Sequence, residues 1–186
     1  MRAHVLVPVK RLDGAKSRLA SALTPAEREQ LVLEMLEHVV AEARRAAVGP
    51  ITIVSSEEVP VAGVERFDDG GLPWNDALRN AMREAVEDEE VAVLLSADLP
   101  RLRAEEVRQL VAATPARGVA IARAKDGGTN AVSMRPPATL VTRFGETGSA
   151  ALHEQAALAA GLEAVVVDLD GLAFDVDTPE DLAAWR

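Results

Sequence analysis

Short β-rich runs alternate with longer segments of helical pattern along this chain. The run at residues 91–95 is apolar at every position. Such a strand is typical of a parallel sheet that is covered by helices on both faces. The alternation therefore predicts an α/β fold with three layers around a mostly parallel sheet. The other expected strands lie at 3–9, 51–55, 118–123, 131–134 and 164–168, and the expected helices at 25–47, 75–87, 103–113, 149–161 and 179–185.

Helix-start signals support two of these assignments. Thr24 precedes Pro25, and Glu27 stands at the third helical position, which is the pattern of a capping box. Thr178 and Pro179 repeat the cap and the proline at the last expected helix.

Size and charge limit the classes of function. The chain has 186 residues, which fits one domain over 1–186, and its net charge is -10. An acidic chain disfavours non-specific binding to nucleic acid or to a membrane surface. Cysteine is absent, and we find neither a signal peptide nor an apolar run of membrane-spanning length. We expect a cytoplasmic protein that acts on small molecules; a homodimer remains open.

Four cations follow the first strand: Lys10, Arg11, Lys16 and Arg18. Ligands of parallel α/β sheets bind beyond the carboxyl ends of the strands, so this loop is expected to lie at the binding edge. It predicts a site for a polyanion such as a triphosphate, although a solvated basic loop is the alternative. A P-loop is excluded because Val9 stands where that motif needs a glycine, and no Gly-x-Gly-x-x-Gly motif follows the strand.

Three carboxylates are candidate metal ligands. Asp98 follows the apolar run 91–95, and Asp175 and Asp177 share one side of an extended segment. Capping of the last helix is the simpler role for Asp177 or Thr178. Mg²⁺ is commonly held by one or two carboxylates together with phosphate oxygens. Distant carboxylates and a basic loop together favour metal-assisted phosphoryl or nucleotidyl transfer.

A second anion site is expected around Thr129 and Ser149. Thr129 offers a hydroxyl group, and Ser149 begins a predicted helix, where amides favour an anion. A plain hairpin turn at Gly127 and Gly128, and a plain helix cap at Ser149, are the alternatives. His153 lies one helical turn after Ser149, from which it could reach this second site.

Four motifs occur in order along the chain: Val7-Pro8-Val9-Lys10 with Lys16-Ser17-Arg18-Leu19, then Ala97-Asp98-Leu99-Pro100, then Gly127-Gly128-Thr129-Asn130-Ala131, then Asp175-Val176-Asp177-Thr178-Pro179-Glu180-Asp181-Leu182. In them the chain resembles the 2-phospho-L-lactate or phosphoenolpyruvate guanylyltransferases (CofC/FbiD type) of deazaflavin coenzyme F-420 biosynthesis. The resemblance runs along essentially the whole chain. Its first and last motifs are shared with many nucleotidyltransferases of the glycosyltransferase-A-like, nucleotide-diphospho-sugar transferase fold.

The resemblance implies transfer of GMP from GTP to the phosphate of a small three-carbon acid, with release of pyrophosphate. It implies Mg²⁺ at Asp98 with Asp177 or Asp175, and an acid site at Thr129, Ser149 and a glycine, for which Gly145 and Gly148 compete. Two residues are inserted before Asn75 relative to the family, so its register on the nucleotide is open. The implied nucleotide site comprises Pro8, Val9, Lys10, Lys16, Asn75 and Asp98, and the catalytic residues are Lys10, Lys16, Arg18 and Asp98.

Other functions remain open. A molybdopterin nucleotidyltransferase is disfavoured because its first loop is usually rich in glycine, and here only Gly14 is present. A sugar nucleotidyltransferase and a non-catalytic nucleotide-binding module are further alternatives. The acceptor is expected to be phosphoenolpyruvate first, with 2-phospho-L-lactate and 3-phosphoglycerate open.

Overall fold

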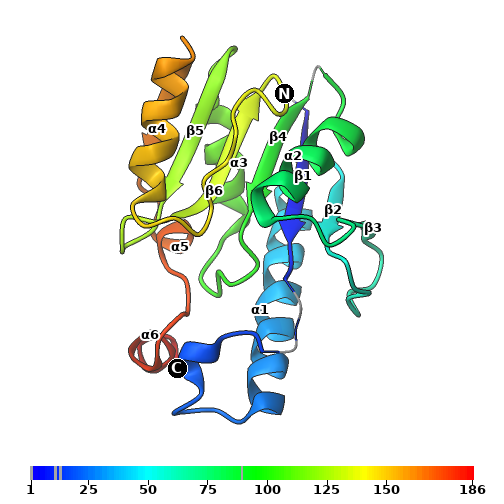
Figure 1. Cartoon of the computed structure of the whole chain (residues 1–186), viewed down its shortest axis with the longest axis vertical. Coiled ribbons are helices and arrows are strands. Elements are labelled where there is room, and N and C mark those ends of the chain that lie inside the picture. The colour runs from blue at the N-terminus through cyan, green and yellow to red at the C-terminus, as the bar shows by residue number, and fades with distance from the viewer. Residues whose placement is uncertain (1, 11, 13, 89) are drawn as a thin grey trace.

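The computed structural model describes residues 2–10, 12, 14–88 and 90–186, and the strands within them form one sheet (Figure 1). The order across the sheet is β3-β2-β1-β4-β6-β5-β7. The strands are β1 (Ala3–Pro8), β2 (Ile51–Val54), β3 (Glu65–Phe67), β4 (Val91–Leu95), β5 (Gly118–Arg123), β6 (Thr129–Arg135) and β7 (Glu163–Val167).

Most strand pairs are parallel, as expected. Among the described strands, only β6 runs against its neighbours β4 and β5. The turn at residues 124–128 joins β5 directly to β6, and such a short connection permits only an antiparallel pair. Because β6 is reversed, its first residues lie at the same edge of the sheet as the ends of β1 and β4.

Helices cover both faces of the sheet. Helices α1 (Pro25–Ala46) and α3 (Ala104–Ala113) pack on one face, where they bury Val5 and Val7 of β1. Helices α2 (Trp74–Ala85) and α4 (Ser149–Ala159) pack on the other face and bury Leu6. Period-two alternation along β1 thus supplies two apolar layers, and the three-layer prediction is confirmed.

The predicted helix starts are also confirmed. The Thr24 hydroxyl accepts from the Glu27 amide, and the Glu27 carboxylate accepts from the Thr24 amide. Thr178 caps α6 (Pro179–Trp185) in the same way, with Asp181 as its partner. Because Thr178 and Asp181 form this capping box, the carboxylate of Asp177 is not needed for the cap.

Three short elements were not predicted from the sequence: strand β3, helix α5 (Asp170–Ala173) and the 3₁₀ turn η1 (Ser17–Leu19). Each has three or four residues, too few for a periodic pattern to register. Strand β6 also begins at Thr129, two residues before the expected start.

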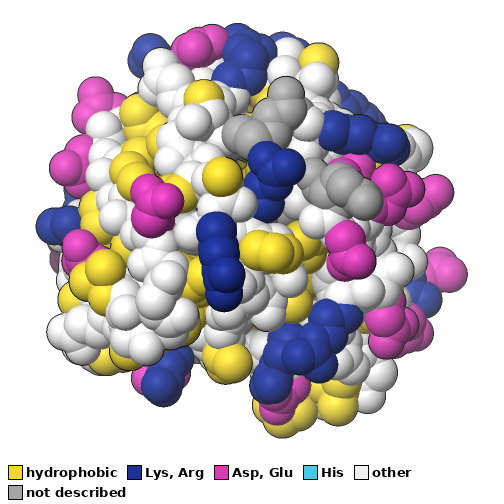
Figure 2. All heavy atoms as spheres, turned by 90° about the horizontal axis from the view of Figure 1, so that it is seen from above, with side chains coloured by type: hydrophobic (Ala, Val, Ile, Leu, Met, Phe, Trp, Pro, Cys, Tyr) yellow, Lys and Arg dark blue, Asp and Glu magenta, His cyan; other side chains and the backbone are white. Residues whose placement is uncertain are grey.

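Figure 1 shows the N-terminus at one end of the sheet and α6 beyond the opposite end. Figure 2 views the end that carries the N-terminus, where basic and acidic side chains are interspersed. Within the part of the chain that the structure describes, no helix is long and apolar enough to cross a membrane.

Candidate active site

A cavity of about 990 Å³ opens where β1 and β4 end. It is formed by the first loop, the turn after β4, the start of β6, the segment 144–149 and the segment that precedes α6. Ligand sites of this size hold molecules as large as a nucleotide. Most predicted site residues line this one cavity: Pro8, Val9, Lys10, Lys16, Arg18, Asp98, Thr129, Gly145, Ser149, Asp175 and Asp177.

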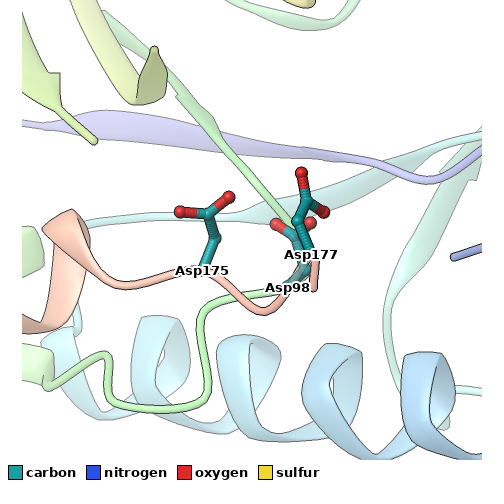
Figure 3. Close-up of side chains that lie close together, drawn as sticks. All are labelled: Asp98, Asp175 and Asp177. Atoms are coloured by element: carbon teal, nitrogen blue, oxygen red, sulfur yellow. The ribbon is translucent and has the colours of Figure 1, made fainter. Parts of the chain in front are cut away.

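Asp98, Asp175 and Asp177 meet on one side of this cavity. Each offers a carboxylate oxygen, and the three oxygens lie within 4.8 Å of one another. Figure 3 shows the three side chains projecting to the same side of the loops that carry them. Sequence alone had left Asp175 and Asp177 as alternatives, and the structure brings both to Asp98. Three convergent carboxylates are the oxygen donor set that a hard cation such as Mg²⁺ requires.

Lys16 bridges two members of this triad. Its Nζ donates to Asp98 Oδ2 at 2.5 Å and to Asp177 Oδ1 at 2.7 Å. Burial alone would lower the pKa of Lys16, but the charges of Asp98 and Asp177 outweigh it and hold that pKa above its ordinary value. Lys16 is therefore protonated where it contacts the triad. Its backbone has a left-handed conformation, with φ of 51°.

The carboxyl group of Asp175 has a perturbed pKa. Burial, followed by the charges of Asp98 and Asp177, raises its pKa to about 6. The Asn130 side-chain amide donates to Asp175 Oδ1 at 3.2 Å and to the Leu172 carbonyl at 2.9 Å. These two bonds fix the Asp175 carboxylate relative to the start of β6.

Lys10 and Arg18 of the first loop are more exposed than Lys16. The Lys10 ammonium lies 4.7 Å from the centre of the Trp74 ring, a cation–π contact at the start of α2. Arg18 lies 3.7 Å from Asp177 Oδ2, with its side chain 74% exposed. Arg11, the fourth predicted cation, lies outside the described residues.

Thr129 and Ser149 form a second cluster on the cavity wall. The Ser149 hydroxyl donates to Thr129 Oγ1 at 3.0 Å, and both side chains are buried. An irregularity in the β5–β6 register pairs Thr129 with Arg123 at the end of the hairpin. This placement puts Thr129 beside the first turn of α4.

The two competing glycines differ in position. Gly145 lines the cavity, and a Cβ there would meet no atom within 4 Å. Gly148 precedes α4 as its N-cap, with φ of 69°, and does not line the cavity. The geometry therefore favours Gly145 for contact with a bound molecule.

His153 is fully buried behind Thr129, not exposed to the cavity. Its Nδ1 lies 3.0 Å from Thr129 Oγ1, and its Nε2 accepts from the Arg143 amide at 2.7 Å. Burial lowers its pKa to about 4, so the ring is neutral at neutral pH.

Asn75 supports the segment that carries Gly145. Its Oδ1 accepts from the Thr142 hydroxyl and from the Phe144 amide, and its Nδ2 donates to the Phe144 carbonyl. It does not line the cavity, although its neighbour Trp74 does. The contact of Asn75 with a nucleotide stays a prediction.

Comparison with known families gives the site its context. Residues 3–185 match the family model described as "Guanylyl transferase CofC like". The chain belongs to this family. It is 40% identical over 190 residues to the phosphoenolpyruvate guanylyltransferase of Sphaerobacter thermophilus, and the alignment covers 98% of this chain and 91% of that one. It is 34% identical to the 2-phospho-L-lactate guanylyltransferase of Methanoregula boonei, over 98% and 81% of the two chains.

Solved structures agree on the fold of this CofC-like chain. A structure from Desulfovibrio desulfuricans G20 superposes with a TM-score of 0.81 at 21% identity, over 98% of this chain and 85% of that one. The CMP:2-keto-3-deoxy-manno-octonic acid synthetase complexed with CTP gives a TM-score of 0.66 at 15% identity, over 99% and 96%. The CofC-like chain thus has the nucleotide-diphospho-sugar transferase fold, as expected from its motifs.

Two contributors to this CofC-like site were not assigned from the sequence: Asn130 behind Asp175 and Trp74 beside Lys10. His153 was expected to reach the second site, and it does so only through its contact with Thr129. Asn130 stood inside a recognised motif, but its partner Asp175 is 45 residues away. Trp74 had a weak signal, because it follows the Gly70-Gly71 turn at the start of a predicted helix.

Proposed function

We propose that this protein is a guanylyltransferase that joins GMP from GTP to the phosphate of a small three-carbon acid and releases pyrophosphate. One observation carries the proposal: a carboxylate triad with a basic loop and a separate hydroxyl cluster line the same cavity. Two anions must be brought together in such a reaction, and the two parts of the cavity offer one site for each.

Mg²⁺ fits the triad, because its three carboxylates provide the oxygen ligands that this ion prefers. Asp98, Asp175 and Asp177 would hold it, and it would supply charge neutralisation at the phosphates of GTP. Lys16 already binds one oxygen each of Asp98 and Asp177. We therefore include in the proposal that Lys16 releases these carboxylates to the metal and turns to the phosphates.

The transfer step follows from the two sites. A phosphate oxygen of the acid attacks the α-phosphorus of GTP, and a P–O–P link forms between them. The bond between the α-phosphorus and the oxygen that links the α- and β-phosphates of GTP breaks. Pyrophosphate leaves with that oxygen and the electron pair of the bond. Lys10, Lys16 and Arg18 stabilise the leaving pyrophosphate, so positioning and charge supply the catalysis. Pro8, Val9 and Asn75 complete the proposed nucleotide site.

Thr129, Ser149 and Gly145 are the proposed acid site. These residues carry no charge, so they would bind the anionic acid through hydroxyl and backbone amide groups. Phosphoenolpyruvate is the proposed first acceptor, because the relative at 40% identity carries that name. 2-Phospho-L-lactate is the second, after the relative from Methanoregula boonei. A cytoplasmic location and small-molecule partners remain part of the proposal.

The test is a pyrophosphate-release assay that crosses GTP, ATP, CTP and UTP with phosphoenolpyruvate, 2-phospho-L-lactate and 3-phosphoglycerate in the presence of Mg²⁺. We expect release with GTP and with phosphoenolpyruvate or 2-phospho-L-lactate only. Binding of GTP without release by any acid would favour a non-catalytic nucleotide-binding module. A second series replaces the acids by a sugar phosphate, and release there would favour a sugar nucleotidyltransferase.

A further inference from the structure

A buried hydrogen-bond chain runs from the backbone of Arg143 through His153 to Thr129. His153 lies on α4 and is 0% exposed, so it touches no bound molecule directly. Thr129, the last member, is 7% exposed and lines the cavity. These hydrogen bonds thus connect His153, which is closed off from the cavity, to Thr129, which lines it.

The tautomer of His153 follows from its partners. The Arg143 backbone amide can only donate, so His153 Nε2, at 2.7 Å from it, must accept and carries no hydrogen. A neutral ring with an unprotonated Nε2 carries its hydrogen on Nδ1. His153 Nδ1 therefore donates, with Thr129 Oγ1 as an acceptor at 3.0 Å. The Ser149 backbone, one helical turn earlier, is a second hydrogen-bond partner of the ring.

Thr129 Oγ1 also accepts from the Ser149 hydroxyl at 3.0 Å. A threonine oxygen has two lone pairs and one hydrogen, and these two bonds use both lone pairs. The remaining Thr129 hydrogen has no acceptor among the hydrogen bonds of the described residues, and it is left to donate toward the cavity that Thr129 lines. The hydroxyl is thus set as a donor before any ligand arrives.

We propose that His153 is a positioning residue for the acceptor site: it fixes the Thr129 hydroxyl as a hydrogen-bond donor to an anionic oxygen, carboxylate or phosphate, of the acid. This inference rests on the proposed function. A donor whose direction is set in advance does not have to be reoriented on binding, and this raises affinity for an acceptor oxygen. A ligand that presents a donor to Thr129 would be rejected, since no lone pair is free.

The surroundings keep His153 in this state. The Phe144 ring packs edge-on against the imidazole, with ring centroids 5.4 Å apart. The charged groups that act on His153 are Glu146 and Arg143, which have opposite signs and pair with each other at 3.3 Å. The ring is therefore held by a neutral environment on each side.

Two substitutions separate the two hydrogen bonds of His153. The amide of Asn reaches the position of Nδ1, so His153→Asn keeps a donor toward Thr129. The amide of Gln reaches the position of Nε2, so His153→Gln keeps an acceptor for Arg143 but loses the donor. His38→Gln is the matched control, because His38 lies on α1 and contacts the Leu102 carbonyl, away from the cavity.

Steady-state kinetics in the pyrophosphate assay give the first readout. We expect His153→Gln to raise the KM for the acid about tenfold, as for loss of one hydrogen bond to a charged group, with the KM for GTP changed less than about twofold. His153→Asn should restore most of the acid affinity, and His38→Gln should match wild type. A merely structural role would change both KM values together and would not be rescued by Asn.

A double-mutant cycle with Thr129→Val gives the second readout. If His153 acts through the Thr129 hydroxyl, His153→Gln should not raise the acid KM further in the Thr129→Val background. An equal effect in both backgrounds would overturn the proposal. So would a ¹⁵N spectrum of the ring that shows hydrogen on Nε2 rather than on Nδ1.

Two different results distinguish a failure of the positioning role of His153 from a failure of the proposed function. If wild type releases pyrophosphate with an acid but His153→Gln leaves its acid KM unchanged, the positioning role alone is overturned. If wild type releases none with any acid, the proposed function fails and the positioning role fails with it.

Discussion

The two sides of the cavity differ in charge and in exposure. The triad side gathers Asp98, Asp175, Asp177 and Lys16, all charged or titratable, with carboxylate oxygens within 4.8 Å of one another. The acceptor side holds neutral groups that are almost wholly buried: Ser149 is 1% exposed and His153 0%. In the proposed function, strong charges would hold a nucleotide–metal complex on the first side, and oriented hydroxyl groups would hold the small acid on the second.

The difference bears on what each side controls. Charges near a reacting phosphate stabilise the developing charge of the transition state, so the triad side should set the rate. Hydrogen bonds of fixed direction discriminate between acceptor and donor groups, so the hydroxyl side should set the choice of acid. Variants of the two sides should therefore differ in kind: kcat for the first, acid KM for the second.

The largest effect is expected at Asp98. Asp98→Asn keeps the shape of the side chain but removes one charge from the triad. Loss of a metal ligand is worth several kcal/mol, so kcat should fall by roughly 1000-fold. The thermal midpoint should remain near wild type, and Asp170→Asn, an exposed carboxylate of α5, is the matched control. Near-normal turnover of Asp98→Asn would remove the metal role from this side.

Lys16 should give the next effect. Lys16→Met removes the cation that bridges Asp98 and Asp177, and kcat should fall by roughly 100-fold, as for loss of one charged group at a transferring phosphate. Because Lys16 no longer competes for these oxygens, Mg²⁺ should raise the thermal midpoint more in Lys16→Met than in wild type. Lys125→Met, outside the cavity, serves as the control. Equal stabilisation of both proteins by Mg²⁺ would argue against competition.

The acceptor side should appear in the pH dependence of stability. The pKa of His153 is lowered from 6.5 to about 4 by burial, so between these values the unfolded chain binds a proton that the folded chain does not. Stability from this group is therefore complete above pH 6.5 and is lost as the pH falls toward 4, by about 3 kcal/mol in total.

Urea unfolding of wild type and His153→Gln at pH 7, 5.5 and 4.5 measures this effect. Taking the difference between the two proteins cancels other groups, such as His4, whose pKa is also lowered, and Asp175, whose pKa is raised. The stability advantage of wild type should shrink toward low pH. A constant difference would mean that His153 is not held neutral in the folded protein.

Asn75 should give the smallest of these effects. It joins α2 to residues 142 and 144 through three hydrogen bonds, so Asn75→Ala should lower the free energy of unfolding by about 2 kcal/mol. Unchanged stability would contradict this supporting role. The KM values add a second answer: a rise for GTP alone would assign Asn75 to the nucleotide, and a rise for both substrates would assign it to the segment that it holds.

The sequence predicted the charged side better than the neutral side, for a physical reason. Asp98 and the basic loop follow buried strands, and the rule that parallel strands end at one edge places them together. Asp175 and Asp177 lie in a capping motif that is readable locally, and the capping box of Thr178 with Asp181 explains why Asp177 is free for Lys16.

The neutral side depends on contacts between distant segments. The spacing from Ser149 placed His153 within reach of the site, but its hydrogen bond to Thr129 exists only because the start of the reversed strand β6 meets the first turns of α4. Two contributions on the charged side also depend on contacts between distant segments. The role of Asn130 depends on the path of the chain after α5. The Lys16 position between two carboxylates likewise needs three segments that are far apart in sequence.

The kinetics of Thr129→Val test the separation of the two sides most directly. The substitution removes the Thr129 hydroxyl and keeps the shape of the side chain. We expect the KM for the acid to rise about tenfold or more, with the KM for GTP and the Mg²⁺ requirement changed less than about twofold. An equal rise in both KM values, or a rise for GTP alone, would contradict it.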